Sequence, residues 1–266
     1  MKKILLFFVL LVACTVHAQT PRQYFYPNGK VSSEGTQDAN GNADGVWTFY
    51  HENGVRKMMG SYSAGAANGE WFYWDMYGRM EKKGFYKNNM LDSCWYFFDM
   101  EGHLARLCYY KNDQLDGLWA EFWNDTLKKE AGMYHLGKKE GSWKKWYDNG
   151  KIREDADYSQ DVIHGQFRLW WDNGNLQAAG KVENGKSEGE WIYYSFEGKK
   201  YSVGSYSKGE WDGKWRSYHA NGKVSATGCY DHGMKVKKWK YFAEDGKLQR
   251  KEIYRKGKLF KEVIFS

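Results

Sequence analysis

One stretch decides the fold, Lys138-Lys139-Glu140-Gly141-Ser142-Trp143-Lys144-Lys145-Trp146-Tyr147-Asp148-Asn149-Gly150-Lys151-Ile152-Arg153. It reads as a turn, a short aromatic strand, a second turn at Asn-Gly and the start of a returning strand. Asn-Gly tolerates the positive φ that a tight hairpin needs, and aromatic residues favour the pleated strand. The stretch therefore predicts a β-hairpin.

The rest of the chain repeats this hairpin with a fixed period. A large aromatic residue recurs every 24 residues, with no insertion, and it is Trp at eight of nine positions. These positions are Trp47, Trp71, Trp95, Trp119, Trp143, Phe167, Trp191, Trp215 and Trp239. Such a period is the signature of a repeat architecture, in which each unit contacts mainly its neighbours.

Other positions keep the same period. Gly stands two residues before the large aromatic in most copies, and Ser93 and Lys237 replace it in two of them. A second aromatic stands three residues after the first, at Tyr50, Trp74, Phe98, Phe122, Trp146, Trp170, Tyr194, Tyr218 and Phe242. In an ideal strand a spacing of three places the two aromatics on opposite faces. Either both faces carry an aromatic row, or a bulge brings the two together.

A unit of this length has room for two short strands and two turns but not for a crossover helix, so consecutive strands must be antiparallel. We therefore predict an all-β protein, an elongated single-sheet meander of about ten antiparallel hairpin repeats. The repeats run over residues 24–266 within an array at residues 19–266. Residues 258–266 are more aliphatic and suit a final strand that caps the open end.

Residues 1–18 have the pattern of a secretory signal peptide. A charged start precedes an apolar run from Ile4 to Ala13, and a small-x-small site ends at Ala18, before Gln19. Residues 11–14 also fit a lipobox, which would leave a lipid-anchored Cys14. We expect an exported protein, periplasmic or extracellular, and both soluble release and lipid anchoring stay open.

The composition fits strands and turns, with 30 Gly, 2 Pro and 18% aromatic residues. The net charge of +7 is spread among interspersed acids and bases, so no nucleic-acid partner is expected. Cys94 and Cys108 flank one turn almost symmetrically; they could form a disulfide across the hairpin or remain two small apolar side chains. No grouping of His, Cys or carboxylates has the spacing of a metal or catalytic site, so we expect no cofactor, no metal and no enzymatic activity.

Three recurring motifs carry a resemblance to a known family. They are seen as Asn221-Gly222-Lys223, Gly228-Cys229-Tyr230 and Asp44-Gly45-Val46-Trp47-Thr48-Phe49-Tyr50. Together they resemble the MORN-repeat variant family of bacteria over nearly all of residues 24–258. The resemblance implies a meander of hairpins used for binding or scaffolding rather than catalysis. Some similar proteins are labelled antitoxin or immunity proteins, which bind a toxin.

We therefore expect a non-enzymatic scaffold that binds a protein partner along an aromatic-lined sheet. Aromatic rows are usually the core of a thin sheet, but Trp and Tyr also present flat faces with polar edges to ligands. The candidate binding row is Trp146, Trp170 and Tyr194. The alternatives are a binder of envelope glycan or of an anionic membrane surface, and an antitoxin-type protein. The exposed end strands also allow a homodimer.

Overall fold

A computed structural model of the protein describes residues 19–265, which contain strands and turns and no helix. The predicted signal peptide, residues 1–18, lies outside the described residues. The chain divides into two compact units, residues 1–90 and 91–266. The first contains β1 (Thr20–Phe25), β2 (Val31–Gln37), β3 (Gly45–Tyr50), β4 (Arg56–Ser63), β5 (Ala66–Trp74) and β6 (Met80–Lys87). Each of these strands pairs antiparallel with the next.

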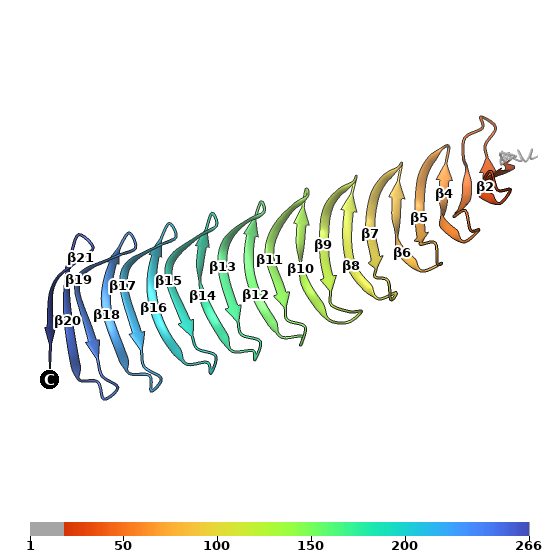
Figure 1. The fold of residues 1–266 in the computed structure, drawn as a ribbon. Helices are drawn as coiled ribbons and strands as arrows, with labels where there is room; N and C mark the ends of the chain where they lie inside the picture. Colours follow the sequence, from red (N-terminus) through yellow and green to blue (C-terminus); the bar gives the residue numbers. More distant parts are fainter. Residues whose placement is uncertain (1–18, 266) are drawn as a thin grey trace, which may run out of the picture. The chain divides into compact units, whose positions relative to one another are not determined.

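The second unit begins at β7 (Met90–Phe98) and is also a meander of consecutive antiparallel pairs (Figure 1). Its further strands are β8 (Leu104–Lys111), β9 (Gln114–Phe122), β10 (Lys128–His135), β11 (Lys138–Trp146), β12 (Ile152–Ser159), β13 (Val162–Trp170), β14 (Leu176–Glu183), β15 (Lys186–Tyr194), β16 (Lys200–Ser207), β17 (Glu210–Tyr218), β18 (Val224–Asp231), β19 (Met234–Phe242), β20 (Leu248–Arg255) and β21 (Lys258–Ile264). The predicted all-β antiparallel meander is confirmed within each unit.

The Asn-Gly-Lys turns hold neighbouring repeats together. At the turn after β11, Gly150 has φ +79°, and the Asn149 side-chain oxygen accepts a hydrogen bond from the backbone N–H of Lys151 at 3.0 Å. The amide nitrogen of Asn149 then donates to the carbonyl of Asp172 in the next repeat at 2.9 Å, and Lys151 Nζ donates to the carbonyl of Asn173 at 2.7 Å. The recurring Asn-Gly-Lys motif is thus explained by structure, because it closes one turn and satisfies carbonyls of the next.

The Gly two residues before each large aromatic marks a β-bulge. Gly141 has φ +69°, and next to it the pairing of β10 with β11 skips from Ala131 opposite Lys144 to Met133 opposite Glu140. A bulge of this kind favours Gly because other residues rarely adopt a positive φ. Ser93 (φ 56°) and Lys237 (φ 59°) adopt the same conformation in their copies.

The large aromatic of each repeat packs flat on the strand before it. Trp143 is 1% exposed, and a Cβ added to Gly132 would lie 2.2 Å from the indole carbon Cδ2. Gly132 therefore leaves the space that the indole occupies. Trp143 Nε1 also donates to the carbonyl of Met133 at 3.1 Å, and its ring meets the ring of Tyr134 edge-on at 5.1 Å. We call the face that carries this row the tryptophan face.

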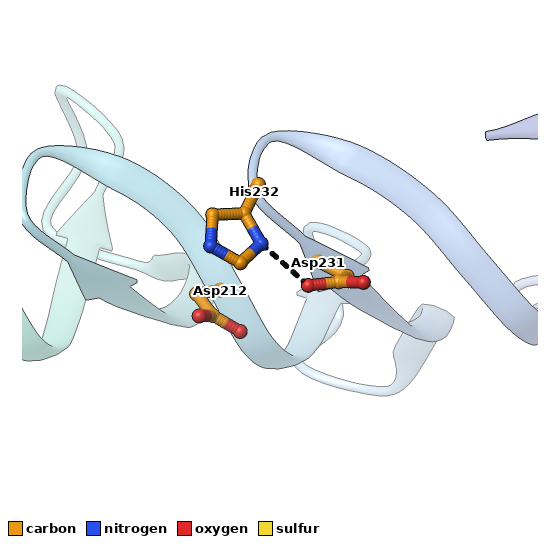
Figure 2. Close-up of side chains that lie close together, drawn as sticks. All are labelled: Asp212, Asp231 and His232. Carbon is orange, nitrogen blue, oxygen red and sulfur yellow. Dashed lines mark hydrogen bonds and ion pairs between the residues drawn. The ribbon is translucent and has the colours of Figure 1, made fainter. Parts of the chain in front are cut away.

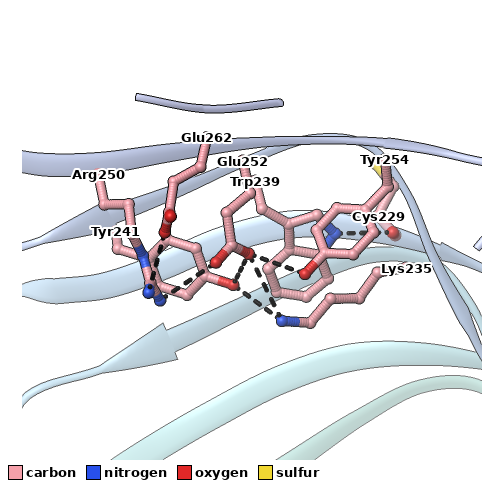
Figure 3. Close-up of polar contacts among 8 residues, drawn as sticks. All are labelled: Cys229, Lys235, Trp239, Tyr241, Arg250, Glu252, Tyr254 and Glu262. Carbon is pink, nitrogen blue, oxygen red and sulfur yellow. Dashed lines mark hydrogen bonds and ion pairs between the residues drawn. The ribbon is translucent and has the colours of Figure 1, made fainter. Parts of the chain in front are cut away.

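The last repeat replaces the Gly–Trp pair with a buried carboxylate (Figure 3). Glu252 takes the repeat position of Gly132 and lies directly opposite Glu262 of β21. Glu252 is 6% exposed and accepts hydrogen bonds from Tyr241 at 2.6 Å and Tyr254 at 3.0 Å. Arg250 lies 3.3 Å from Glu252 and 3.4 Å from Glu262, so one guanidinium bridges the two facing acids. Polar contacts thus hold the last two strands together where no further Trp follows.

The disulfide that the sequence left open is not formed in this structure. Cys94 and Cys108 are buried free thiols. The pairing of β7 with β8 places Cys94 opposite Tyr109 and Cys108 opposite Trp95. The two cysteines are thus one residue out of register, and their side chains point to opposite faces of the pleated sheet. Cys108 takes the small-residue position that Gly132 holds in its own repeat.

Candidate binding face

The second aromatic row lies on the face opposite the tryptophan face. Ring contacts join residues two apart in one strand, as between Trp191 and Tyr193 at 6.2 Å on the tryptophan face and between Phe72 and Trp74 at 5.9 Å on the other. Side chains of a strand alternate between faces, so a spacing of three separates Trp143 from Trp146. One bulge precedes Trp143, and a second register shift opposite Lys145 and Trp146 has its extra residue in β12, so neither brings the two rings together.

The structure places Trp146, Trp170 and Tyr194 at equivalent positions, as the last residues of β11, β13 and β15. All three are half-buried. Each follows the preceding one by two strands, a spacing of roughly 9.5 Å. Opposite them in the next strands stand Ile152, Leu176 and Lys200. The row therefore packs partly against aliphatic neighbours and keeps part of each ring accessible.

The turns fix the backbone of this row. Tyr147 donates its hydroxyl to the carbonyl of Trp170 at 2.8 Å, and Trp171 donates Nε1 to the carbonyl of Tyr194 at 3.2 Å. At the equivalent place in a later repeat, His219 Nε2 lies 2.8 Å from the carbonyl oxygen of Phe242. A turn residue of one repeat thus holds the strand end of the next.

Cations lie beside the aromatic row on the same face. Lys144, Arg168, Arg216 and Lys240 each precede a second-row aromatic by two residues, and all four are exposed. The equivalent residue of β15 is Ile192. We call the face defined by these residues together with Trp146, Trp170, Tyr194, Tyr218 and Phe242 the aromatic–basic face. The aromatic row of this face was predicted from the sequence, but its cations were not; they stand at one position of the repeat and recur in four of its copies.

A shallow depression of about 340 Å³ marks this face over β15 to β18. Its lining includes Glu190, Lys214, Arg216 and Tyr218. Tyr218 also borders two neighbouring depressions, and Lys200 Nζ lies 4.8 Å from the centre of its ring. A tyrosine ring with cations nearby can contact apolar and anionic groups together.

The largest pKa shifts belong to tyrosines of the tryptophan face. Burial, together with a hydrogen bond to Tyr206 at 2.7 Å, raises the pKa of Tyr193 far above its usual range. Burial also raises the pKa of Tyr110 to about 12. These hydroxyls stay protonated at neutral pH and serve packing and hydrogen bonding. Their environment does not prepare them for proton transfer.

One group of possible metal ligands occurs in the described part of the chain (Figure 2). The side-chain ligand atoms of Asp212, Asp231 and His232 lie within 4.8 Å of one another. His232 Nδ1 is 2.7 Å from Asp231 Oδ1, and this hydrogen bond and the nearby carboxylate charges raise the pKa of His232. Asp231 ends β18 and His232 begins the turn after it; both are exposed, and the ion pair between them accounts for their arrangement. The sequence analysis did not anticipate that Asp212 meets His232.

The fold defines a class: a repeat scaffold of antiparallel hairpins. The MORN repeat variant model matches residues 20–38, 43–64, 139–160, 211–232 and 235–256. The recurring motifs predicted this family, and its model matches five repeats spread across the chain. This family suggests a repeat scaffold and is generally non-enzymatic.

Other comparisons add little. No curated protein matches the chain. Among solved structures, it is similar to the crystal structures of TcdB2-TccC3 and TcdB2-TccC3-Cdc42, each at 11% identity, with TM-scores of 0.21 and 0.20. A Photorhabdus luminescens Tc holotoxin pore matches at 10% identity and a TM-score of 0.20. The matches cover 91%, 89% and 93% of this chain but 16%, 16% and 17% of those chains. A likeness at this level carries no argument about function.

Residues 19–265 contain no helix that could cross a membrane.

Proposed function

We propose that this protein is an exported, non-enzymatic repeat scaffold that binds a protein partner over its aromatic–basic face. The supporting observation is the difference between the two faces. On the tryptophan face six of the nine large rings are buried, and most of the nine pack against glycines and tyrosines. On the aromatic–basic face, half-buried rings stand beside exposed cations in successive repeats. Aromatic residues with adjacent Arg are enriched in protein interfaces, where they supply much of the binding energy.

The test replaces the candidate row. The triple variant W146A/W170A/Y194A is compared with the wild-type protein in affinity capture from envelope extract, followed by mass spectrometry and a binding assay with the purified captured protein. We expect a protein that wild type retains and the triple variant loses. A control variant, L136A, removes an exposed turn side chain and leaves the row and its hydrogen bonds unchanged. If the triple variant stays folded by circular dichroism and retains the same proteins, binding through this row is refuted.

Two companion measurements separate the alternatives. Sedimentation with cell-wall material or with anionic liposomes, dependent on Trp146, Trp170 and Tyr194, would favour a glycan or membrane-surface binder. Rescue of a co-expressed toxin encoded beside this protein would favour an antitoxin role.

Export is part of the same proposal and rests on the pattern of residues 1–18. The mass of the mature N-terminus tests it, because cleavage before Gln19 and a lipidated Cys14 give different masses. An intact leader on the protein isolated from cells would refute export.

A further inference from the structure

The aromatic–basic face contains a continuous cross-strand row at its centre. In β16 to β20 the strand pairings place Val203 opposite Arg216, Arg216 opposite Thr227, Thr227 opposite Lys240, and Lys240 opposite Lys251. Residues directly opposite in antiparallel strands lie on the same face with Cβ atoms roughly 5 Å apart. Three of these five side chains are cations.

Two more cations lie on the same face of these strands. Lys214 lines the depression together with Arg216, and Lys238 takes the equivalent position in β19. Lys214, Arg216, Lys238 and Lys240 are exposed, and Lys251 is half-exposed. In the described part of the chain none of the five forms an ion pair, since every carboxylate oxygen lies beyond 4.0 Å of their nitrogens. They therefore form an uncompensated positive patch, which we call the β17–β20 patch.

In β11 to β13, the cations of this face lie opposite a carboxylate. Lys144 lies opposite Asp155, with 3.9 Å between Nζ and Oδ2. Arg168 lies opposite the same Asp155, from the strand on its other side. In the patch, by contrast, Lys240 faces Lys251, and like charges directly opposite in a sheet are destabilising. An anion supplied from outside would remove this repulsion.

We propose that the β17–β20 patch binds an acidic segment of the protein partner. This inference rests on the proposed function and specifies the chemistry of the partner. Charge complementarity argues for an anionic occupant. The adjacent row supplies apolar contacts, because Tyr218 and Phe242 lie beside the cations and stand opposite Val224 and Leu248. A polypeptide can combine carboxylates with apolar side chains to match both rows.

The spacing of the patch suits an extended chain that crosses the strands. Arg216 and Lys240 are two strands apart, roughly 9.5 Å. Three residues of polyproline II chain advance about 9.3 Å and complete one turn, so every third side chain points the same way. An acidic residue at every third position of such a segment would meet successive cations of the row.

The experiment uses the full mature chain and a fluorescein-labelled oligoglutamate peptide, with binding followed by fluorescence anisotropy. The test variant is R216E/K240E. The control is K138E/K186E, which reverses two exposed cations at strand starts outside the patch and so has the same net charge. We expect wild type and control to bind the peptide with affinity that falls as salt rises, and the test variant to bind about tenfold more weakly or worse.

Folding of the test variant is not at risk, because both residues are exposed and a Glu at position 240 would face Lys251. We expect its melting temperature to equal or exceed that of wild type. The inference is overturned if wild type does not bind the peptide at low salt. It is also overturned if both variants bind the peptide equally more weakly than wild type. Binding of anionic vesicles or an acidic polysaccharide through Arg216 and Lys240 while the peptide fails to bind overturns it as well. None of these results depends on Trp146, Trp170 and Tyr194, so failure of the patch and failure of the aromatic row are distinguishable.

Discussion

The contact between Gly132 and Trp143 makes a sharp test of how the repeats are held together. Gly132 has no positive φ, so Ala suits its backbone, but the new Cβ would lie 2.2 Å from the indole of Trp143. The ring would have to leave its position. A fully buried Trp removes about 200 Å² from water, worth about 5 kcal/mol at about 25 cal/mol per Å². Losing roughly half of that, with the hydrogen bond to Met133, predicts that G132A lowers the free energy of unfolding by about 3 kcal/mol.

The chain contains a natural compensation for this change. In the next repeat the small residue is Ala156, which is fully buried, and the aromatic opposite it is Phe167 in place of Trp. The smaller ring accommodates the extra methyl group. The double variant G132A/W143F copies that pair, so we expect it to cost at least about 1 kcal/mol less than the sum of its single variants.

The assay is urea unfolding followed by far-ultraviolet circular dichroism, which does not depend on the fluorescence of the replaced Trp. The control is G137A, at a turn Gly with φ +78° where a Cβ meets no atom within 4 Å. Its cost comes from the backbone alone and should be about 1 kcal/mol. A G132A variant no less stable than G137A, or a strictly additive double variant, would show that the ring does not depend on the glycine.

Three further predictions concern the repeats and the last strands. K237G should raise the free energy of unfolding by about 1 kcal/mol in thermal melts, because Lys237 is held at φ 59° and Gly is not strained there; no gain would refute the strain. N149A should lower it by about 1 kcal/mol in urea, since it removes two hydrogen bonds at the turn, whereas D148A should have little effect. Burial would raise the pKa of Glu252, but hydrogen bonds from Tyr241 and Tyr254 and nearby positive charge outweigh it and lower the pKa. The stability from Glu252 is therefore present above its unfolded pKa, about 4.3, and is lost as pH falls through the folded value. The acid-induced loss of stability should be smaller in E252Q than in wild type; identical pH profiles would contradict the assignment.

Much of the fold follows from local sequence patterns. Asn149 and Gly150 specify a tight turn, and a 24-residue unit leaves no room for a crossover connection between its strands. The same pattern recurs in nearly every repeat. The antiparallel meander was therefore predictable. The role of Gly132 was not predictable. It depends on the ring of Trp143, which reaches over from the neighbouring strand, and only the pairing register reveals that contact.

The candidate site was predictable only in part. The aromatic row of Trp146, Trp170 and Tyr194 is periodic, so the sequence could identify it. Whether it shares a face with Trp143 depends on where the bulge falls, and the sequence left that open. The charged central row is not periodic across the chain, since Tyr96 and Ala120 occupy the positions that Lys144 and Arg168 occupy later. A search for residues that recur in every repeat therefore does not detect these cations.

That contrast between the two faces is the strongest argument for where function lies. On the tryptophan face, each ring lies opposite a small residue. Where that residue is Ala156 the ring is Phe167, and where it is Cys108 the ring of Trp119 is less buried than that of Trp143. The central row of the aromatic–basic face varies more widely, from the buried Ala120 to the exposed Lys240, without altering the register. A scaffold can vary its binding properties only where packing permits. The side chains of the β17–β20 patch differ from those of the other repeats by their unpaired positive charges. Packing of the sheet does not require these charges.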